Sequence, residues 1–163
     1  MAEKPNIPSE ARTLEEKYKI LAPQIKSLIE DENDLIANMA NITSVLKWGL
    51  GHLWVGFYIV KDKQLVLGPY QGPVACTRIS YGKGVCGKAW QEQSSVMVPD
   101  VNLFPGHIAC SADSKSEIVI PGISGKNVIF VLDIDSAQKN SFSEIDRKYL
   151  EMIVKLLIDY SDC

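Results

Sequence analysis

Apolar residues recur with a helical period towards both ends of the chain and with a strand-like pattern between them. Over residues 34–50 and 145–160, spacings of three and four predict two amphipathic helices. A shorter apolar stripe after a capping-box pattern at Thr13 predicts another helix before them. Because proline lacks the amide hydrogen used inside a helix, Pro23 is expected to interrupt this helix and to start a second one over residues 24–29.

The middle of the chain has the pattern of strands and turns. Residues 53–60 and 128–132 are apolar runs rich in β-branched and aromatic side chains, which predicts two central strands covered on both faces. In the first run Trp54 and Tyr58 share one face, with Gly56 between them, so this wall has room for a ligand. The same aromatic side chains also suit an ordinary core. Shorter extended segments are expected at 64–67, 76–79, 95–98 and 118–120, and a short helix at 85–91.

Helices flanking these strands predict an α+β domain with a mixed or antiparallel sheet and helices to one side. We expect residues 1–12 to form a flexible leader and residues 13–163 to form a single domain. The net charge of −3 provides no basic field for nucleic acid or for an anionic membrane surface. The longest apolar run is too short to span a bilayer, and the N-terminus resembles no secretory signal, so a cytoplasmic protein is expected.

The four cysteines are the strongest sign of chemistry, and no two of them form a CxxC pair. Cys110 lies with His107 in a polar, proline-punctuated loop at 99–121, where functional residues are common. Cys86 is expected in the first turn of the short helix, where the helix dipole favours a thiolate. Cys163 is expected to have no role.

Several kinds of chemistry remain open from the residues alone. A zinc site built from cysteines and His107 has poor ligand spacing, and no oriented base supports an acyl-transfer hydrolase. Buried, inert cysteines are the default interpretation. Asp133 and Asp135 share one strand face and either reach solvent or line a pocket. Sulfoxide reduction would use thiols and crowded carboxyl groups together, because a thiolate attacks sulfur while an acid protonates the departing oxygen.

Five segments together resemble the free methionine-(R)-sulfoxide reductases, enzymes with a GAF domain. The segments are PGHIACSADSKSEIVIP, GVCGKAW, PVACTRI, WVGFY and VLDID. The resemblance implies a six-stranded antiparallel sheet with helices packed on one face and a closed pocket on the other. It implies reduction of free L-methionine (R)-S-oxide through a cysteine sulfenic acid and an intramolecular disulfide, with thioredoxin as electron donor. It implies no cofactor and no metal.

The resemblance also suggests roles for individual residues. Cys110 matches the family's nucleophile, and Cys76 and Cys86 match the other pocket cysteines, of which Cys76 is the first choice as the resolving thiol. The remaining residues are expected to bind substrate or hold its proton: Trp54 and Tyr58 as an aromatic wall, Val85 through its backbone amide, and Glu117, Asp133 and Asp135 as acids. A homodimer is possible. The alternative is a non-catalytic GAF module that binds a small ligand.

Overall fold

A computed structural model describes residues 5–9, 11, 13–108 and 111–162 of the chain. Within these residues, three long helices and one short helix accompany six strands, and a 3₁₀ turn lies at Val101–Leu103. The helices are α1 (Leu14–Ile29), α2 (Leu35–Leu50), α3 (Gly84–Glu92) and α4 (Glu144–Tyr160). The strands are β1 (Trp54–Lys61), β2 (Gln64–Gln71), β3 (Arg78–Ser80), β4 (Val96–Val98), β5 (Ser116–Ser124) and β6 (Asn127–Ser136).

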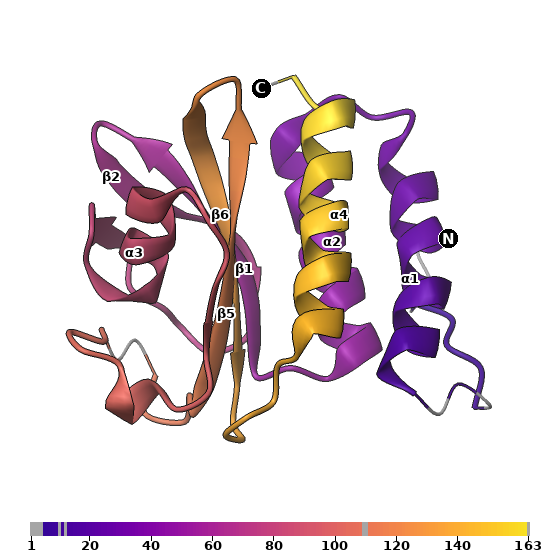
Figure 1. Cartoon of the computed structure of the whole chain (residues 1–163). Helices are drawn as coiled ribbons and strands as arrows, with labels where there is room; N and C mark the ends of the chain where they lie inside the picture. Colours follow the sequence, from indigo (N-terminus) through magenta and orange to yellow (C-terminus); the bar gives the residue numbers. More distant parts are fainter. Residues whose placement is uncertain (1–4, 10, 12, 109–110, 163) are drawn as a thin grey trace.

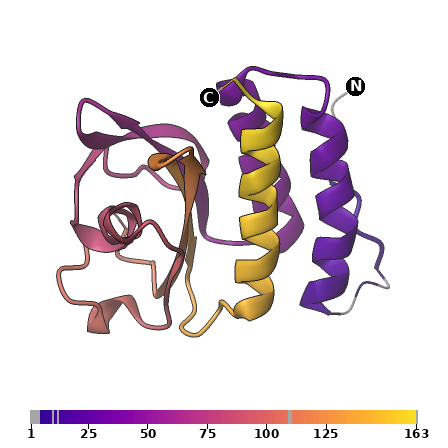
Figure 2. The same cartoon turned by 45° about the horizontal axis from the view of Figure 1, so that its top comes forward.

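The strands form one antiparallel sheet in the order β3-β2-β1-β6-β5-β4. Figure 1 shows this sheet between two unequal layers, with α2 and α4 against one face and α3 on the other. Helix α1 lies outside α2 and α4 and packs on both, which Figure 2 shows from a second direction. The predicted α+β fold is confirmed, with α3 as an addition on the face opposite the long helices.

Strand alternation divides the apolar residues into two cores. Val55 and Phe57 of β1 face the long helices, whereas Trp54 and Tyr58 face α3. This division confirms the predicted sharing of faces along the first apolar run. The larger core therefore stabilises the three-helix layer, and the smaller one surrounds the face that carries the polar residues described below.

The expected interruption at Pro23 is wrong, because α1 continues through it from Leu14 to Ile29. Proline does cost one helical hydrogen bond. However, the buried stripe runs across that position: Tyr18, Leu21 and Ile25 are fully inaccessible to solvent in the core against α2 and α4. Tertiary packing of this stripe offsets the local cost, since most helix stability in proteins comes from burial of one face.

The β1–β2 hairpin turns at Asp62 and Lys63, whose φ angles of 49° and 62° suit a tight turn between twisted strands. Strand β2 extends to Gln71 and includes part of the region expected to be a loop. The expected leader is partly in contact with the domain, since Asn6 exchanges two hydrogen bonds with Gln24 and Ile7 packs on the core. The boundary at residue 12 stays a prediction.

Candidate functional site

Strand register places three carboxyl groups on the sheet face that α3 covers. Glu117 of β5 lies directly opposite Asp135 of β6, and Asp133 is two residues earlier on the same face. Opposed residues of antiparallel strands have Cα atoms about 4.5–5.5 Å apart, so the three acids are close neighbours. The expectation that Asp133 and Asp135 line a pocket rather than reach solvent agrees with their position among the pocket-lining residues.

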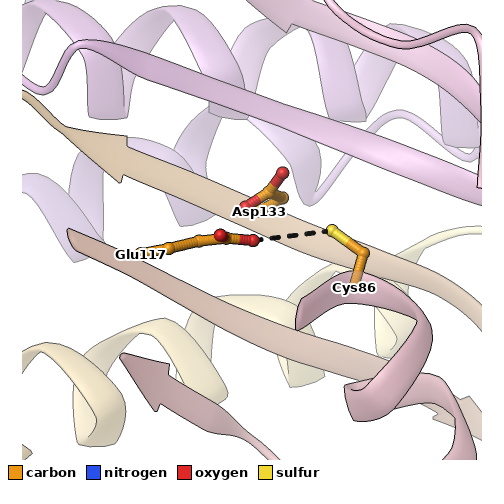
Figure 3. A group of neighbouring side chains, drawn as sticks. All are labelled: Cys86, Glu117 and Asp133. Carbon is orange, nitrogen blue, oxygen red and sulfur yellow. Dashed lines mark hydrogen bonds between the residues drawn. The ribbon is translucent and has the colours of Figure 1, made fainter. Parts of the chain in front are cut away.

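Cys86 faces these acids from the first turn of α3. Its side chain is buried, and its Sγ lies 4.0 Å from Oε1 of Glu117, as Figure 3 shows. Burial raises the pKa of the Cys86 thiol well above its ordinary value, and the nearby Asp133 and Glu117 carboxylates raise it further. The expectation that the helix dipole favours the thiolate is therefore wrong for this environment, because desolvation and two acids outweigh one helix terminus.

The three carboxyl groups hold their protons more tightly than isolated ones. Burial raises the pKa of Glu117 and of Asp133 well above the usual range, and repulsion among the acids adds to it. Burial also raises the pKa of Asp135, although a hydrogen bond from the Ser114 hydroxyl and the proximity of His107 offset part of this. This environment thus favours the protonated form of the carboxyl groups, which is the form that can donate a proton to an oxygen atom.

The acidic cluster has one further contact and one oxygen atom without a partner. Nε2 of His107 lies 3.5 Å from Oε2 of Glu117, at the edge of the pocket. Oδ1 of Asp133 is buried and has no hydrogen-bond partner in the described part of the chain. A buried acceptor without a partner costs about 1–3 kcal/mol, so this atom is a position where a ligand would restore a missing interaction.

Aromatic side chains form the opposite wall. Trp54 stacks between Tyr58 and Tyr70, with ring centroids 5.9 and 5.4 Å away. The Trp54 indole N–H donates to the carbonyl of Pro73, and the Tyr58 hydroxyl donates to the carbonyl of Cys76. These hydrogen bonds fix both rings at the edge of the pocket and connect the wall to the segment between β2 and β3 that carries Cys76.

The room expected at Gly56 is filled. A Cβ at this position would lie 2.3 Å from the Trp54 ring and 2.5 Å from Cβ of Tyr70. The glycine therefore serves the close stacking of the aromatic wall, and it is not among the residues that line the pocket.

The cysteines are in different states. Cys76 is disulfide-bonded and Cys86 is a free thiol. Cys110 and Cys163 lie outside the described residues, so the expected role of Cys110 stays a prediction.

The first turn of α3 forms another side of the pocket. Lys83 provides no side-chain cap for this helix, and the first amides of a helix have no carbonyl one turn earlier to bind. The amides of Gly84, Val85 and Cys86 are therefore available to an anion. The described residues lining the pocket are Leu53, Trp54, Tyr58, Pro73, Val74, Ala75, Ile79, Gly84, Val85, Cys86, His107, Ile108, Ser111, Ser114, Glu117, Asp133 and Asp135.

Two contributors to the site were not recognised in the sequence. Ser114 binds Asp135, but nothing in the polar loop before β5 distinguishes it from its neighbours. Tyr70 completes the aromatic stack from a segment that was expected to be a loop. A strand pattern continuing beyond Leu67 would have placed Tyr70 in β2. Two glycines and two prolines at 68–73 obscure that pattern in the sequence.

Comparison with known proteins agrees with this geometry. The model of the GAF domain family matches residues 30–157. GAF domain-containing protein A of Dictyostelium discoideum is 58% identical over 88% of this chain and 91% of its own length. Free methionine-R-sulfoxide reductase of Escherichia coli is 41% identical over 87% of each chain.

A solved structure extends the likeness to three dimensions. The free methionine-R-sulfoxide reductase of Neisseria meningitidis, in complex with its substrate, has a TM-score of 0.92 and 46% identity, covering 96% of this chain and 95% of that one. In the described part of this chain, every helix is too short or too polar to cross a membrane. The chain belongs to the GAF domain family and, within it, to the group that contains the free methionine-R-sulfoxide reductases.

Proposed function

We propose that this protein reduces free L-methionine (R)-S-oxide to L-methionine. The observation that carries the proposal is the cluster of buried, proton-retaining acids facing the uncapped first turn of α3 across one pocket. Relatives that cover most of the chain carry the name of this activity. A pocket with acids on one side and free amides on the other matches a small zwitterion that bears an oxygen atom to be protonated.

Each end of the substrate finds a chemically suitable partner. The amides of Gly84, Val85 and Cys86 would accept the substrate carboxylate, since they lie at the positive end of the α3 dipole. The acids Asp135 and Glu117 would bind the ammonium group or the sulfoxide oxygen. The Trp54 and Tyr58 rings would contact the methyl group and side chain.

The proposed reaction transfers one oxygen atom to a thiol. The sulfur of Cys110 attacks the sulfoxide sulfur while a protonated carboxyl group of the cluster gives its proton to the oxygen. The oxygen passes to Cys110, which becomes a sulfenic acid, and methionine leaves. A second thiol then attacks the sulfenic acid, so that a disulfide and one water molecule form.

Cys76 is our choice for the second thiol. It is disulfide-bonded in the structure, whereas Cys86 remains a thiol that burial keeps protonated, and condensation needs a thiolate. Thioredoxin would reduce the disulfide by donating two electrons from its dithiol, which restores both cysteines. Glutathione, which lacks a paired thiol, would recycle the protein more slowly.

The experiment is turnover of defined sulfoxides by the purified protein with thioredoxin and its reductase. We expect methionine from the free (R)-sulfoxide and little from a peptide containing methionine sulfoxide, because a residue inside a peptide lacks the carboxylate and the ammonium group that the amides and acids would bind. We expect little from the (S)-epimer, because its oxygen and its methyl group would exchange places between the acids and the aromatic rings. Cys110→Ser should abolish turnover and Cys163→Ser should not. Equal rates on free and peptide-bound substrate, or substrate binding without turnover, would refute the proposal; the latter would indicate a non-catalytic ligand-binding domain. Size-exclusion chromatography would test the expected homodimer.

A further inference from the structure

Cys86, Glu117 and Asp133 present one sulfur and two carboxylate oxygens to a common point. These three atoms lie within 4.8 Å of one another, and their residues come from α3, β5 and β6 (Figure 3). All three side chains are buried. Oδ1 of Asp133 has no hydrogen-bond partner in the described part of the chain, which by itself indicates a missing ligand at this point.

The donor set is typical of zinc. Zn²⁺ binds thiolate, imidazole and carboxylate, usually with four ligands in a tetrahedron. A zinc tetrahedron places sulfur and oxygen ligands about 3.5 Å apart. Sγ of Cys86 and Oε1 of Glu117 are 4.0 Å apart, so a contraction of about half an ångström would bring them to that spacing. Nε2 of His107 lies 3.5 Å from the other Glu117 oxygen but outside the group of three, so a water molecule would complete the tetrahedron.

The charge around the cluster also favours a cation. Of the described residues that line the pocket, three are acids, one is histidine, and none is lysine or arginine. The positive end of the α3 dipole is unfavourable for a cation, but it is a partial charge set against three carboxyl groups, and a metal ion would itself stabilise the Cys86 thiolate. Without a metal ion, burial favours protonated carboxyl groups. Binding of Zn²⁺ would release these protons, because the positive charge of the metal takes their place.

We propose that Cys86, Glu117 and Asp133 form a Zn²⁺ site, with a water molecule as fourth ligand, and that Zn²⁺ and the substrate exclude each other from this pocket. Binding does not require a reduced Cys76, because Cys86 is free while Cys76 is disulfide-bonded. Zn²⁺ displaces the Cys86 thiol proton and the carboxyl protons to solvent, so affinity rises with pH. The exclusion of substrate rests on the proposed function; the binding of Zn²⁺ does not.

The experiment measures metal binding directly. ZnCl₂ is titrated into the whole protein, with Cys76 oxidised, in the presence of a chromophoric chelator, and Co²⁺ serves as a spectroscopic probe of the ligands. We expect one Zn²⁺ per chain, tighter binding at higher pH, and a thiolate-to-cobalt charge-transfer band. Cys86→Ser should abolish the band. Cys86→Ser and Asp133→Asn should each weaken zinc binding by more than about 100-fold, because even a change behind the ligands costs about 10–100-fold.

Two controls separate this site from adventitious binding. Asp31→Asn and Asp62→Asn each remove an exposed carboxylate, and both should keep the wild-type zinc affinity. Circular dichroism checks that each variant is folded. Binding that survives in Cys86→Ser or Asp133→Asn, or that fails equally in the controls, would overturn the proposal, as would the absence of stoichiometric binding. Zinc binding by a protein without turnover would refute the proposed function alone, and turnover that saturating Zn²⁺ does not inhibit would refute mutual exclusion.

Discussion

The buried acids of the pocket should make the protein less stable as pH rises, and Asp133→Asn should relieve much of this loss. The pKa of Asp133 is raised in the folded protein by burial and by the neighbouring Glu117 and Asp135. Below the ordinary carboxyl pKa, both folded and unfolded chains carry the proton, so there is no difference between them. Above it the unfolded chain releases the proton first, and the free energy of unfolding falls until pH reaches the folded pKa.

The size of the effect follows from the raised pKa of Asp133. Across that window one such group reduces stability by about 1.4 kcal/mol per pH unit. Asparagine has nearly the same shape, cannot ionise, and offers an N–H₂ group to Glu117 or to the Cys86 sulfur. Because each pH unit inside the window contributes about 1.4 kcal/mol, we expect Asp133→Asn to be more stable than the wild type by about 1–3 kcal/mol at about pH 8 and by almost nothing at about pH 4. For a domain of 163 residues this corresponds to a rise in Tm of about 3–9 °C.

The assay is thermal unfolding of the wild type and the variant over this pH range, with both proteins in the same redox state. Asp31→Asn is the matched control, since Asp31 is exposed and its change should give no pH-dependent offset. Activity of Asp133→Asn should fall although its stability rises. If the wild type were equally stable at both pH values, or if the difference in Tm were constant with pH, the account of the acidic cluster would be wrong.

Three other substitutions test separate parts of the structure. Glu117→Gln should lower kcat by about 10²–10⁴-fold, as expected for a general acid. The decline of kcat that we expect for the wild type at alkaline pH should disappear in the variant. Methionine yields measured against pH in a stopped assay would show this, and an unchanged pH profile would exclude the role of Glu117 as the acid. Gly56→Ala should destabilise the protein by about 1–3 kcal/mol in urea unfolding, because the new methyl group meets the Trp54 ring; full stability would mean that the wall moves freely. Tyr18→Phe should cost about 1–2 kcal/mol by the same measurement, since it removes the 2.9 Å hydrogen bond to the buried Asp146, and a smaller cost would mean that this bond contributes little.

Side-chain periodicity predicted the elements well, because period and face are local properties. The alternation in WVGFY placed Trp54 and Tyr58 together, and that in VLDID placed Asp133 and Asp135 together. Two local rules failed where packing opposed them. Pro23 remains inside α1 because a buried stripe spans it, and Cys86 is not ionised by its helix because the acids and burial dominate.

The sequence by itself determined which residues share a strand face, where most elements lie, and, through the resemblance of five segments, which family to expect. Only the tertiary structure decided that Glu117 lies opposite Asp135, that α3 covers these acids with Cys86, that Ser114 lines the pocket, and that Tyr70 stacks on Trp54. The reason is physical. A strand's alternation depends on its own backbone, whereas pairing register, helix placement and the shift of a carboxyl pKa depend on groups distant in sequence that only the folded chain brings together.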